Sequence, residues 1–353
     1  MNLDDILREY GLPRLMSIRV DDQSGWIFPF EKEARDICSA HGAQFAFVEG
    51  QNMQAAAIQD DVEIVVMYAG MFWMLCRLAA EITRSGAFIN MTGEAEPIWT
   101  PDTKKSFKIP RTILEEGKPF DWKFESIGWK DLPERQMLFY TILSILFRFV
   151  IYHEVGHLEN DHMRRRQIAV SPILMDAPQP TLLNPVDAIP SQAREIIADN
   201  FAIFRVIELL SRELNLKDEL AMTKVLRSKL MPNQEELVGF VLTIVFLYFR
   251  LADRNDWTSS SIKRLSHPPA PFRLKAILGA ILENHKKLAI SDMAAQRLIK
   301  GIPMTGHAVM SVTLNVYPEM NWLRSISSSE HDEHYKCIFT EIPNWRGRLE
   351  LNP

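Results

Sequence analysis

One uninterrupted stretch, residues 131–166, determines how this chain folds, and it reads DLPERQMLFYTILSILFRFVIYHEVGHLENDHMRRR. Asp131 suits a helix N-cap, Pro133 suits the first turn, and Glu134 completes a capping-box pattern. No Pro or Gly follows for several turns, and apolar residues fall on nearly every side of the resulting helix. We therefore predict a long helix over about residues 132–166 that is buried against several neighbours.

Within this helix, the sequence His153-Glu154-Val155-Gly156-His157 places two histidines four positions apart. Residues at i and i+4 lie one above the other on a helix face, so two imidazoles there are able to share one zinc ion at about 2.0–2.1 Å. Glu154 then lies beside the metal, where it is placed to take a proton from bound water. Taken alone, the pattern is also compatible with an ordinary helical turn.

A second motif, Glu195-Ile196-Ile197-Ala198-Asp199, lies within a predicted helix over residues 191–214. Glu195 and Asp199 share one face of that helix because they are four positions apart. A catalytic zinc site takes three protein ligands and keeps a fourth position open for water, and Glu195 suits the third ligand. Asp199 then accepts the outer N–H of a ligand histidine and fixes its tautomer. The alternative is a solvated polar face opposite an apolar stripe.

A third motif reads Ser266-His267-Pro268-Pro269-Ala270-Pro271-Phe272-Arg273. His267 and Arg273 are both hydrogen-bond donors, and such donors stabilise an oxyanion that develops beside a metal ion. Without the other two motifs, a segment of this kind is simply a loop that precedes a helix.

Together, and in this order, the three motifs resemble those of gluzincin zinc metallopeptidases of the HtpX and CAAX prenyl endopeptidase type. The resemblance implies that His153, His157 and Glu195 are zinc ligands and that Glu154 is the general base. It also implies that His267 and Arg273 lie near the substrate carbonyl. It also implies Zn2+ as the cofactor and a protein or peptide as the substrate. The likeness spans residues 54–273 and leaves both ends of the chain uncovered.

The same family binds its substrate along an edge marked by an N-A-x-A stretch before a strand. Gln54-Ala55-Ala56-Ala57 is similar, with Gln in place of Asn. Apolar and β-branched residues are grouped between turn signals over residues 44–68, and this pattern predicts β structure there. We expect residues 53–58 to form the edge of a small mixed sheet, where an extended substrate would add a further strand.

Members of that family such as HtpX carry transmembrane helices, and this chain differs from them. Its three apolar runs, Ile64–Cys76, Met137–Tyr152 and Leu237–Phe249, are shorter than the roughly 20 residues that a bilayer span needs. We therefore expect buried helices and no full transmembrane span, while peripheral membrane contact stays open. A soluble relative is implied, which is also similar in its HExxH layout to the phage-exclusion protease Lit.

The bulk composition narrows the class of protein. A net charge of −5 lacks the basic face that nucleic-acid binding usually needs, so no nucleic-acid partner is expected. The cysteines Cys38, Cys76 and Cys337 are few and far apart, which indicates a reducing compartment rather than a disulfide framework. The start of the chain, residues 1–5, is acidic where a signal peptide would be basic, and we predict a cytoplasmic protein.

We predict a mainly helical α+β fold in which the zincin-like active-site helix packs against the small mixed sheet. Residues 1–300 are expected to form one peptidase domain, with residues 301–353 as an extension of unknown role. Residues 171–190 hold five prolines, so we expect a surface loop there, which is a candidate lid over the site. Further helices are predicted over residues 234–252, 271–285 and 290–300.

Three other histidines raise the question of further ligands. His162 would lie about 140° around a continuous helix from His157, so we expect a supporting or a surface position for it and not a ligand role. His331 and His334 occur in an acidic stretch near the end of the chain, which we interpret as a solvated tail.

The function predicted from these residues is zinc-dependent hydrolysis of peptide bonds by a metal-bound water, with Glu154 as general base. One alternative is a latent phage-defence or stress-triggered suicide protease of the Lit type, with residues 301–353 as its regulatory element. The other is a non-catalytic binding protein stabilised by zinc. An intact Glu154 disfavours it, because a structural site needs no base and prefers four protein ligands. Neither the substrate nor the oligomeric state follows from the sequence.

Overall fold

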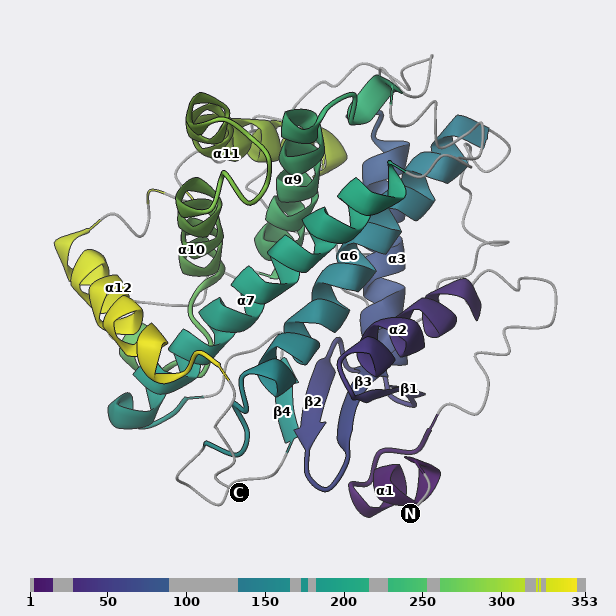
Figure 1. The fold of residues 1–353 in the computed structure, drawn as a ribbon, viewed down its shortest axis with the longest axis vertical. Helices are drawn as coiled ribbons and strands as arrows, with labels where there is room; N and C mark the ends of the chain where they lie inside the picture. Colours follow the sequence, from purple (N-terminus) through teal and green to yellow (C-terminus); the bar gives the residue numbers. More distant parts are fainter. Residues whose placement is uncertain are drawn as a thin grey trace.

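Long helices form the body of the protein, and a small sheet lies at one end of it (Figure 1). The structure is a computed structural model, and the residues that it describes are 3–14, 28–88, 133–165, 173–176, 182–215, 228–252, 261–314, 322, 324 and 328–347. Of residues 173–176 it describes the backbone alone. The predicted mainly helical α+β class with a small mixed sheet is confirmed.

The helices of the described residues include one at each range predicted, namely 132–166, 191–214, 234–252, 271–285 and 290–300, with bounds that differ, and others that were not predicted. They are α1 (Leu3–Glu9), α2 (Phe28–Ala40), α3 (Ala69–Arg84), α6 (Pro133–Glu159), α7 (Pro185–Glu213), α9 (Gln234–Ala252), α10 (Ala270–Glu283), α11 (Asp292–Leu314) and α12 (Ser329–Glu341). The helix predicted over 191–214 begins earlier, at Pro185, and the helix predicted over 290–300 continues to Leu314. The predicted domain boundary at residue 300 therefore lies within α11.

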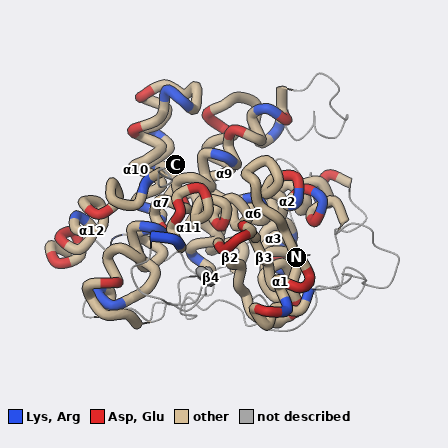
Figure 2. Tube along the Cα trace, turned by 60° about the horizontal axis from the view of Figure 1, so that its bottom comes forward, with Lys and Arg blue, Asp and Glu red and all other residues tan. Residues whose placement is uncertain are grey.

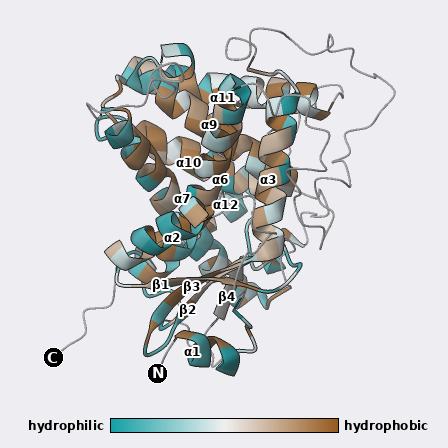
Figure 3. Ribbon diagram, turned by 90° about the vertical axis from the view of Figure 1, so that its right-hand side faces the viewer, coloured by the Kyte–Doolittle hydropathy of each residue, from teal (hydrophilic) through white to brown (hydrophobic). Residues whose placement is uncertain are grey.

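The sheet contains β1 (Gln44–Val48), β2 (Ala55–Gln59), β3 (Glu63–Tyr68) and β4 (Ile173–Asp176), in the order β1-β3-β2-β4. β1 runs parallel to β3, whereas β2 runs antiparallel to both of its neighbours. One face of the sheet packs on α1, and the other face packs on α2 and α6 (Figure 3). Because both faces are covered, the strands are apolar without strict alternation.

β2 lies inside the sheet and not at its edge. Its central residue Ala57 pairs with Val65 of β3 on one side and with Leu174 of β4 on the other. The expectation that residues 53–58 form a free edge is therefore wrong, because a strand from the proline-rich segment covers that side. A proline-free run of four residues was long enough to pair there.

The predicted loop over residues 171–190 is also wrong in part. It contains β4, and its end forms the first turns of α7, where Pro185 occupies the start of the helix and Pro190 lies inside it. Proline is tolerated in a first helical turn, which accounts for Pro185, whereas Pro190 removes one backbone hydrogen bond from the helix. Residues 171–172 and 177–181 lie outside the described residues, and so does the prediction of a lid formed by them.

Helix α6 begins as predicted but ends at Glu159 and not near Arg166, which is itself outside the described residues. The Asn160 side chain donates to the carbonyl of Gly156 at 2.7 Å, and Asp161 adopts a left-handed conformation with φ 51°. Asn and Asp favour such helix ends because their short polar side chains bond locally to the backbone. The chain then turns back beside the last turn of α6.

Helix α6 is buried along most of its length. It is the one helix among the described residues that is long and apolar enough to cross a membrane, yet 83% of its most apolar window is buried inside the protein. Its buried Arg148 donates to Glu33 of α2 and, at 2.7 Å, to Glu213 of α7. These ion pairs join three helices at one level, in agreement with the prediction of a helix that several neighbours surround.

Residues near the end of the chain form α12, which packs on α7. The solvated tail expected at His331 and His334 is wrong, because both side chains are buried. His334 lies 2.8 Å from Gln192 of α7, and Ile338 of α12 lies in a small apolar cluster with residues of α7 and α10. The acidic residues of α12 face outward, and charges of both signs are interspersed along the outer helices (Figure 2).

Gly156 allows α6 and α7 to approach each other closely. A Cβ atom at this position would lie 3.1 Å from the Cα of Ala198 and 3.2 Å from the Cβ of Phe201. Backbone of a neighbouring helix cannot retreat as a flexible side chain can, so a side chain here would push the two helices apart. The contact lies beside Glu195, which must reach across from α7.

We predict that Gly156→Ala lowers the free energy of unfolding by about 1–3 kcal/mol, because overpacking separates the helices. The matched control is Gly301→Ala in α11, where an added Cβ meets nothing within 4 Å. This control should gain up to about 1 kcal/mol from its better helix propensity. Urea unfolding of both variants measures the difference, and equal effects at the two positions would contradict the close approach.

Candidate metal centre

Side chains from two helices converge on one buried point. His153 and His157 extend from consecutive turns of α6, and Glu195 reaches them from α7. The Nε2 atoms of the two histidines are 3.1 Å apart, and the Glu195 oxygens lie 3.3 Å from Nε2 of His153 and 3.5 Å from Nε2 of His157. Ligands of a tetrahedral zinc ion are separated by about 3.3–3.4 Å, given bond lengths of about 2.0–2.1 Å. The spacing therefore fits one such ion.

Asp199 and Arg273 fix the outer side of His153. The Nδ1 atom of His153 lies 3.0 Å from Asp199, and Arg273 donates two hydrogen bonds of 2.7 Å to the same carboxylate. Burial raises the pKa of Asp199, but the Arg273 guanidinium outweighs this and holds it below its usual value. An ionised Asp199 accepts the Nδ1 proton, so Nε2 of His153 carries a lone pair. The predicted supporting role of Asp199 matches this geometry.

A different chain of contacts fixes His157. Its Nδ1 atom lies 2.8 Å from Nδ1 of His162, and Nε2 of His162 lies 3.1 Å from the carbonyl oxygen of Trp345. Because α6 ends at Glu159, the turn that follows returns His162 to the site, and its side chain is buried. Of the two positions expected for His162, supporting or surface, the structure has it buried beside His157. The end of α6 at Glu159, which was not predicted, brings it there.

The protonation states suit metal ligands. Burial lowers the pKa of His157 well below its usual 6.5, although Glu195 opposes this. Burial alone raises the pKa of Glu195, but positive charge beside the carboxylate, first at His267 and then at His157 and His153, outweighs burial and holds that pKa well below 4.5. Burial, reinforced by the charge of Arg194, lowers the pKa of His162 to about 3. Neutral imidazoles and an ionised carboxylate are the forms that bind metal.

These states leave three acceptors facing one another. With the protons on Nδ1, the Nε2 atoms of His153 and His157 and the carboxylate of Glu195 contribute lone pairs and no hydrogen to the space between them. Buried acceptors at such distances repel unless a cation satisfies them. Two imidazoles and one carboxylate are a donor set of catalytic zinc sites, which keep one position open. The residues present therefore fit a zinc ion.

His267 reaches the same point from a third element. It follows the 3-10 helix η1 (Ile262–Arg264), and its Nε2 atom lies 3.5 Å from a Glu195 oxygen. Gln192 of α7 holds this loop by donating to the carbonyls of Ile262 and Leu265, each at 2.8 Å. The loop and the zinc-ligand helix are thus joined, and a donor at His267 is placed to serve an oxyanion beside the ligands.

Glu154 is fully buried and follows the candidate ligand His153 directly on α6. Arg273 differs from the role expected for it. Its guanidinium is occupied by Asp199, and its nearest approach to Glu195 is 4.0 Å. A bidentate pair of this kind positions the carboxylate, so the contact favours a supporting role for Arg273 rather than the expected one at the substrate carbonyl.

The predicted substrate-binding residues lie on the sheet beside α6. Ala55, Ala56 and Ala57 are fully buried in β2, and the carbonyl of Gln54 accepts a hydrogen bond of 3.0 Å from Tyr68. Gln59 was not predicted to belong to the site. Its amide donates to Asp161 at 2.8 Å and so joins β2 to the turn after α6. Gln192 and Trp345 were not predicted either, and no sequence motif marks Gln59, Gln192 or Trp345.

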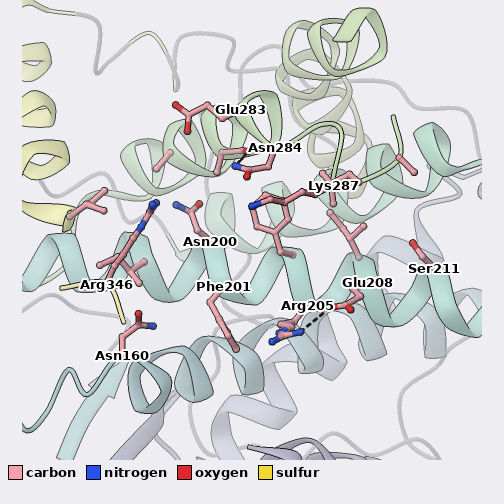
Figure 4. A pocket seen from close by; sticks show the side chains of 18 of the residues that line it. Asn160, Asn200, Phe201, Arg205, Glu208, Ser211, Glu283, Asn284, Lys287 and Arg346 are labelled. Atoms are coloured by element: carbon pink, nitrogen blue, oxygen red, sulfur yellow. Dashed lines mark hydrogen bonds and ion pairs between the residues drawn. The ribbon is translucent and has the colours of Figure 1, made fainter. Parts of the chain in front are cut away.

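One hollow among the described residues lies away from the candidate ligands. It is a groove of about 1310 Å3 along the face of α7 that is opposite the metal centre, between α7 and α10. Figure 4 shows Asn160 and Arg346 at one end and the ion pair of Arg205 with Glu208 farther along. None of the three candidate ligands lines it. The groove therefore offers no access to the metal centre in this conformation.

Comparisons of the chain with protein-family models, with curated proteins and with solved structures find no match. The resemblance to gluzincins therefore rests on the motifs and on the geometry described above.

We predict that Arg273→Met lowers the free energy of unfolding by about 3–5 kcal/mol, because it leaves the buried Asp199 carboxylate without its cation. Arg297→Met is the matched control, since Arg297 makes a comparable bidentate pair with Glu235 at an exposed position. That control should change stability by about 1 kcal/mol or less. Chemical unfolding monitored by circular dichroism compares the two, and a small effect at Arg273 would exclude the supporting role.

Proposed function

We propose that the protein is a zinc-dependent endopeptidase of the gluzincin type. The observation that carries the proposal is the buried group of three acceptors, His153, His157 and Glu195, with a carboxylate at Glu154 directly beside it. A structural zinc site would bring a fourth protein ligand, whereas a site with three ligands and an adjacent base is organised for hydrolysis. A protein or peptide is the proposed substrate, and a cytoplasmic location stays a prediction.

Zinc, when bound, supplies a water of lowered pKa, about 7, and polarises the substrate carbonyl. Glu154 accepts the proton of the attacking water and passes it to the amine that leaves. His267 donates a hydrogen bond to the oxygen that becomes negatively charged, because its Nε2 atom faces the ligand group. Asp199 holds His153 in the tautomer that binds metal, and Arg273 holds Asp199.

We predict that Glu154→Gln retains the full zinc content and loses casein cleavage by at least about 100-fold, because the amide cannot accept the proton. Glu134→Gln is the control, since Glu134 lies near the exposed start of the same helix and pairs with Lys229. It should keep wild-type cleavage. Casein cleavage by the Glu154→Gln variant at the wild-type rate would exclude the proposed base. Wild-type protein that holds zinc but cleaves no denatured protein would instead support the non-catalytic alternative.

The latent form of this peptidase is favoured by a specific observation. Glu154 and the three ligands are 0–1% exposed, so a polypeptide cannot reach them in this conformation. In addition, β4 already pairs with β2 along residues 55–58, which is where an extended substrate is expected to bind. We infer that β4 must leave β2 before a substrate strand can take its place. This conformation is therefore the resting one.

A disulfide between β2 and β4 tests the latent form. Ala57 and Leu174 are cross-strand partners, so we expect the pair Ala57→Cys and Leu174→Cys to form a bond on oxidation, in a Cys337→Ser background that removes the exposed thiol. Oxidised protein should lose at least about 10-fold of its cleavage rate, and reductant should restore it. The single variant Ala57→Cys serves as control. Undiminished cleavage by the oxidised protein would show that β4 does not need to move.

A further inference from the structure

We propose that the metal centre includes the end of the described chain: residues 342–347, the C-terminal clamp, hold the ligand His157 through His162. His162 is on this view a positioning residue, which neither touches substrate nor binds the metal itself. The inference rests on the proposed zinc site, because the clamp can affect metal binding only if His157 is a ligand. No sequence motif marks residues 342–347.

If both imidazoles are neutral, the two hydrogen bonds that link Trp345, His162 and His157 have only one consistent direction. The carbonyl of Trp345 accepts and cannot donate, so Nε2 of His162 must carry the proton. Nδ1 of a neutral His162 is then an acceptor, and the contact of 2.8 Å requires the proton to be on Nδ1 of His157. Nε2 of His157 is left with its lone pair toward His153 and Glu195. One backbone carbonyl thus determines which nitrogen of His157 is free to bind metal.

The clamp is held by the same two helices that carry the ligands. Asn160, at the end of α6, accepts a hydrogen bond of 2.8 Å from the backbone N–H of Gly347. Arg194 of α7, next to the ligand Glu195, lies 4.5 Å above the ring of Trp345. That ring also donates to Glu341 at 2.7 Å. The carbonyl of Trp345 is therefore fixed relative to both ligand helices.

Packing supports the same placement. The 3-10 helix η3 (Ile342–Asn344) begins the clamp, and Ile342 lies in the apolar cluster that contains Ile196 and Ile197 of α7. Ile338 of α12 belongs to this cluster as well and is fully buried. Removing the clamp would therefore expose the side of α7 next to Glu195 and leave Nε2 of His162 without its acceptor.

Two substitutions of His162 separate positioning from mere packing. His162→Phe keeps a ring of similar size but accepts and donates nothing, and we expect about 10–100-fold weaker zinc binding, the usual effect of losing such a partner. His162→Gln can accept from His157 and donate to Trp345, so it should recover most of the affinity. Competition with a chromogenic chelator measures zinc affinity without any activity assay, and the absorption spectrum of bound Co2+ reports the ligand geometry.

Truncations of the full chain test the clamp itself. A chain that ends at Glu341 lacks the clamp, and we expect it to bind zinc as weakly as His162→Phe does. A chain that ends at Gly347 keeps the clamp and serves as the control with wild-type affinity. Because the clamp acts through His162, the truncation combined with His162→Phe should lose no more than either change alone.

The outcomes distinguish this inference from the proposed function. Wild-type zinc affinity in His162→Phe, or in the chain that ends at Glu341, would overturn the clamp whatever the activity of the protein. Equal losses for His162→Phe and His162→Gln would also overturn it, since packing alone would then explain both. Zinc binding that depends on His162 in a protein without cleavage would uphold the clamp and overturn the peptidase. Wild-type protein that binds no zinc would overturn both.

Discussion

The close approach of α6 and α7 at Gly156 is the constraint on which the rest of the structure depends. A carboxylate side chain is short, so Glu195 reaches the two imidazoles of α6 only because the helices nearly touch beside it. The same two helices are joined again by Arg148 and Glu213, farther from the metal centre. Two contacts, one steric and one ionic, thus determine where α7 presents its ligand. The small sheet, α10 and α12 pack around this pair.

The sequence was sufficient wherever the relevant residues lie on one helix. The spacing of His153 and His157, and that of Glu195 and Asp199, follows from helical geometry, and the structure has both pairs on helices. The apolar runs predicted buried helices that correspond to α3, α6 and α9, and apolar and β-branched residues between turn signals predicted the β structure over residues 44–68, which contains β1, β2 and β3. In each case the residue types of the segment itself, and the turn signals that bound it, indicate the local structure.

The sequence was insufficient wherever residues distant in the chain decide the outcome. β4 pairs with β2 through backbone bonds, which leave no signature in side-chain chemistry. His162 reaches His157 because α6 stops at Glu159, and Arg273 turns to Asp199 because a buried carboxylate attracts it. The burial of α12 likewise depends on α7 and not on its own acidic composition. Such partners become visible only when the tertiary structure brings them together.

Pro190 lies inside α7, between β4 and the candidate zinc ligand Glu195 along the chain. Proline has no backbone N–H, so the carbonyl of Val186 lacks its helical partner, and Val186 itself is 84% exposed. The turn from Pro185 to Pro190 therefore lacks one of the backbone hydrogen bonds of a regular helix. Ser191 and the four residues that follow it are buried. Under the proposed function, this turn separates β4, which must leave β2, from the candidate ligand Glu195, so the strand and the ligand are not rigidly linked.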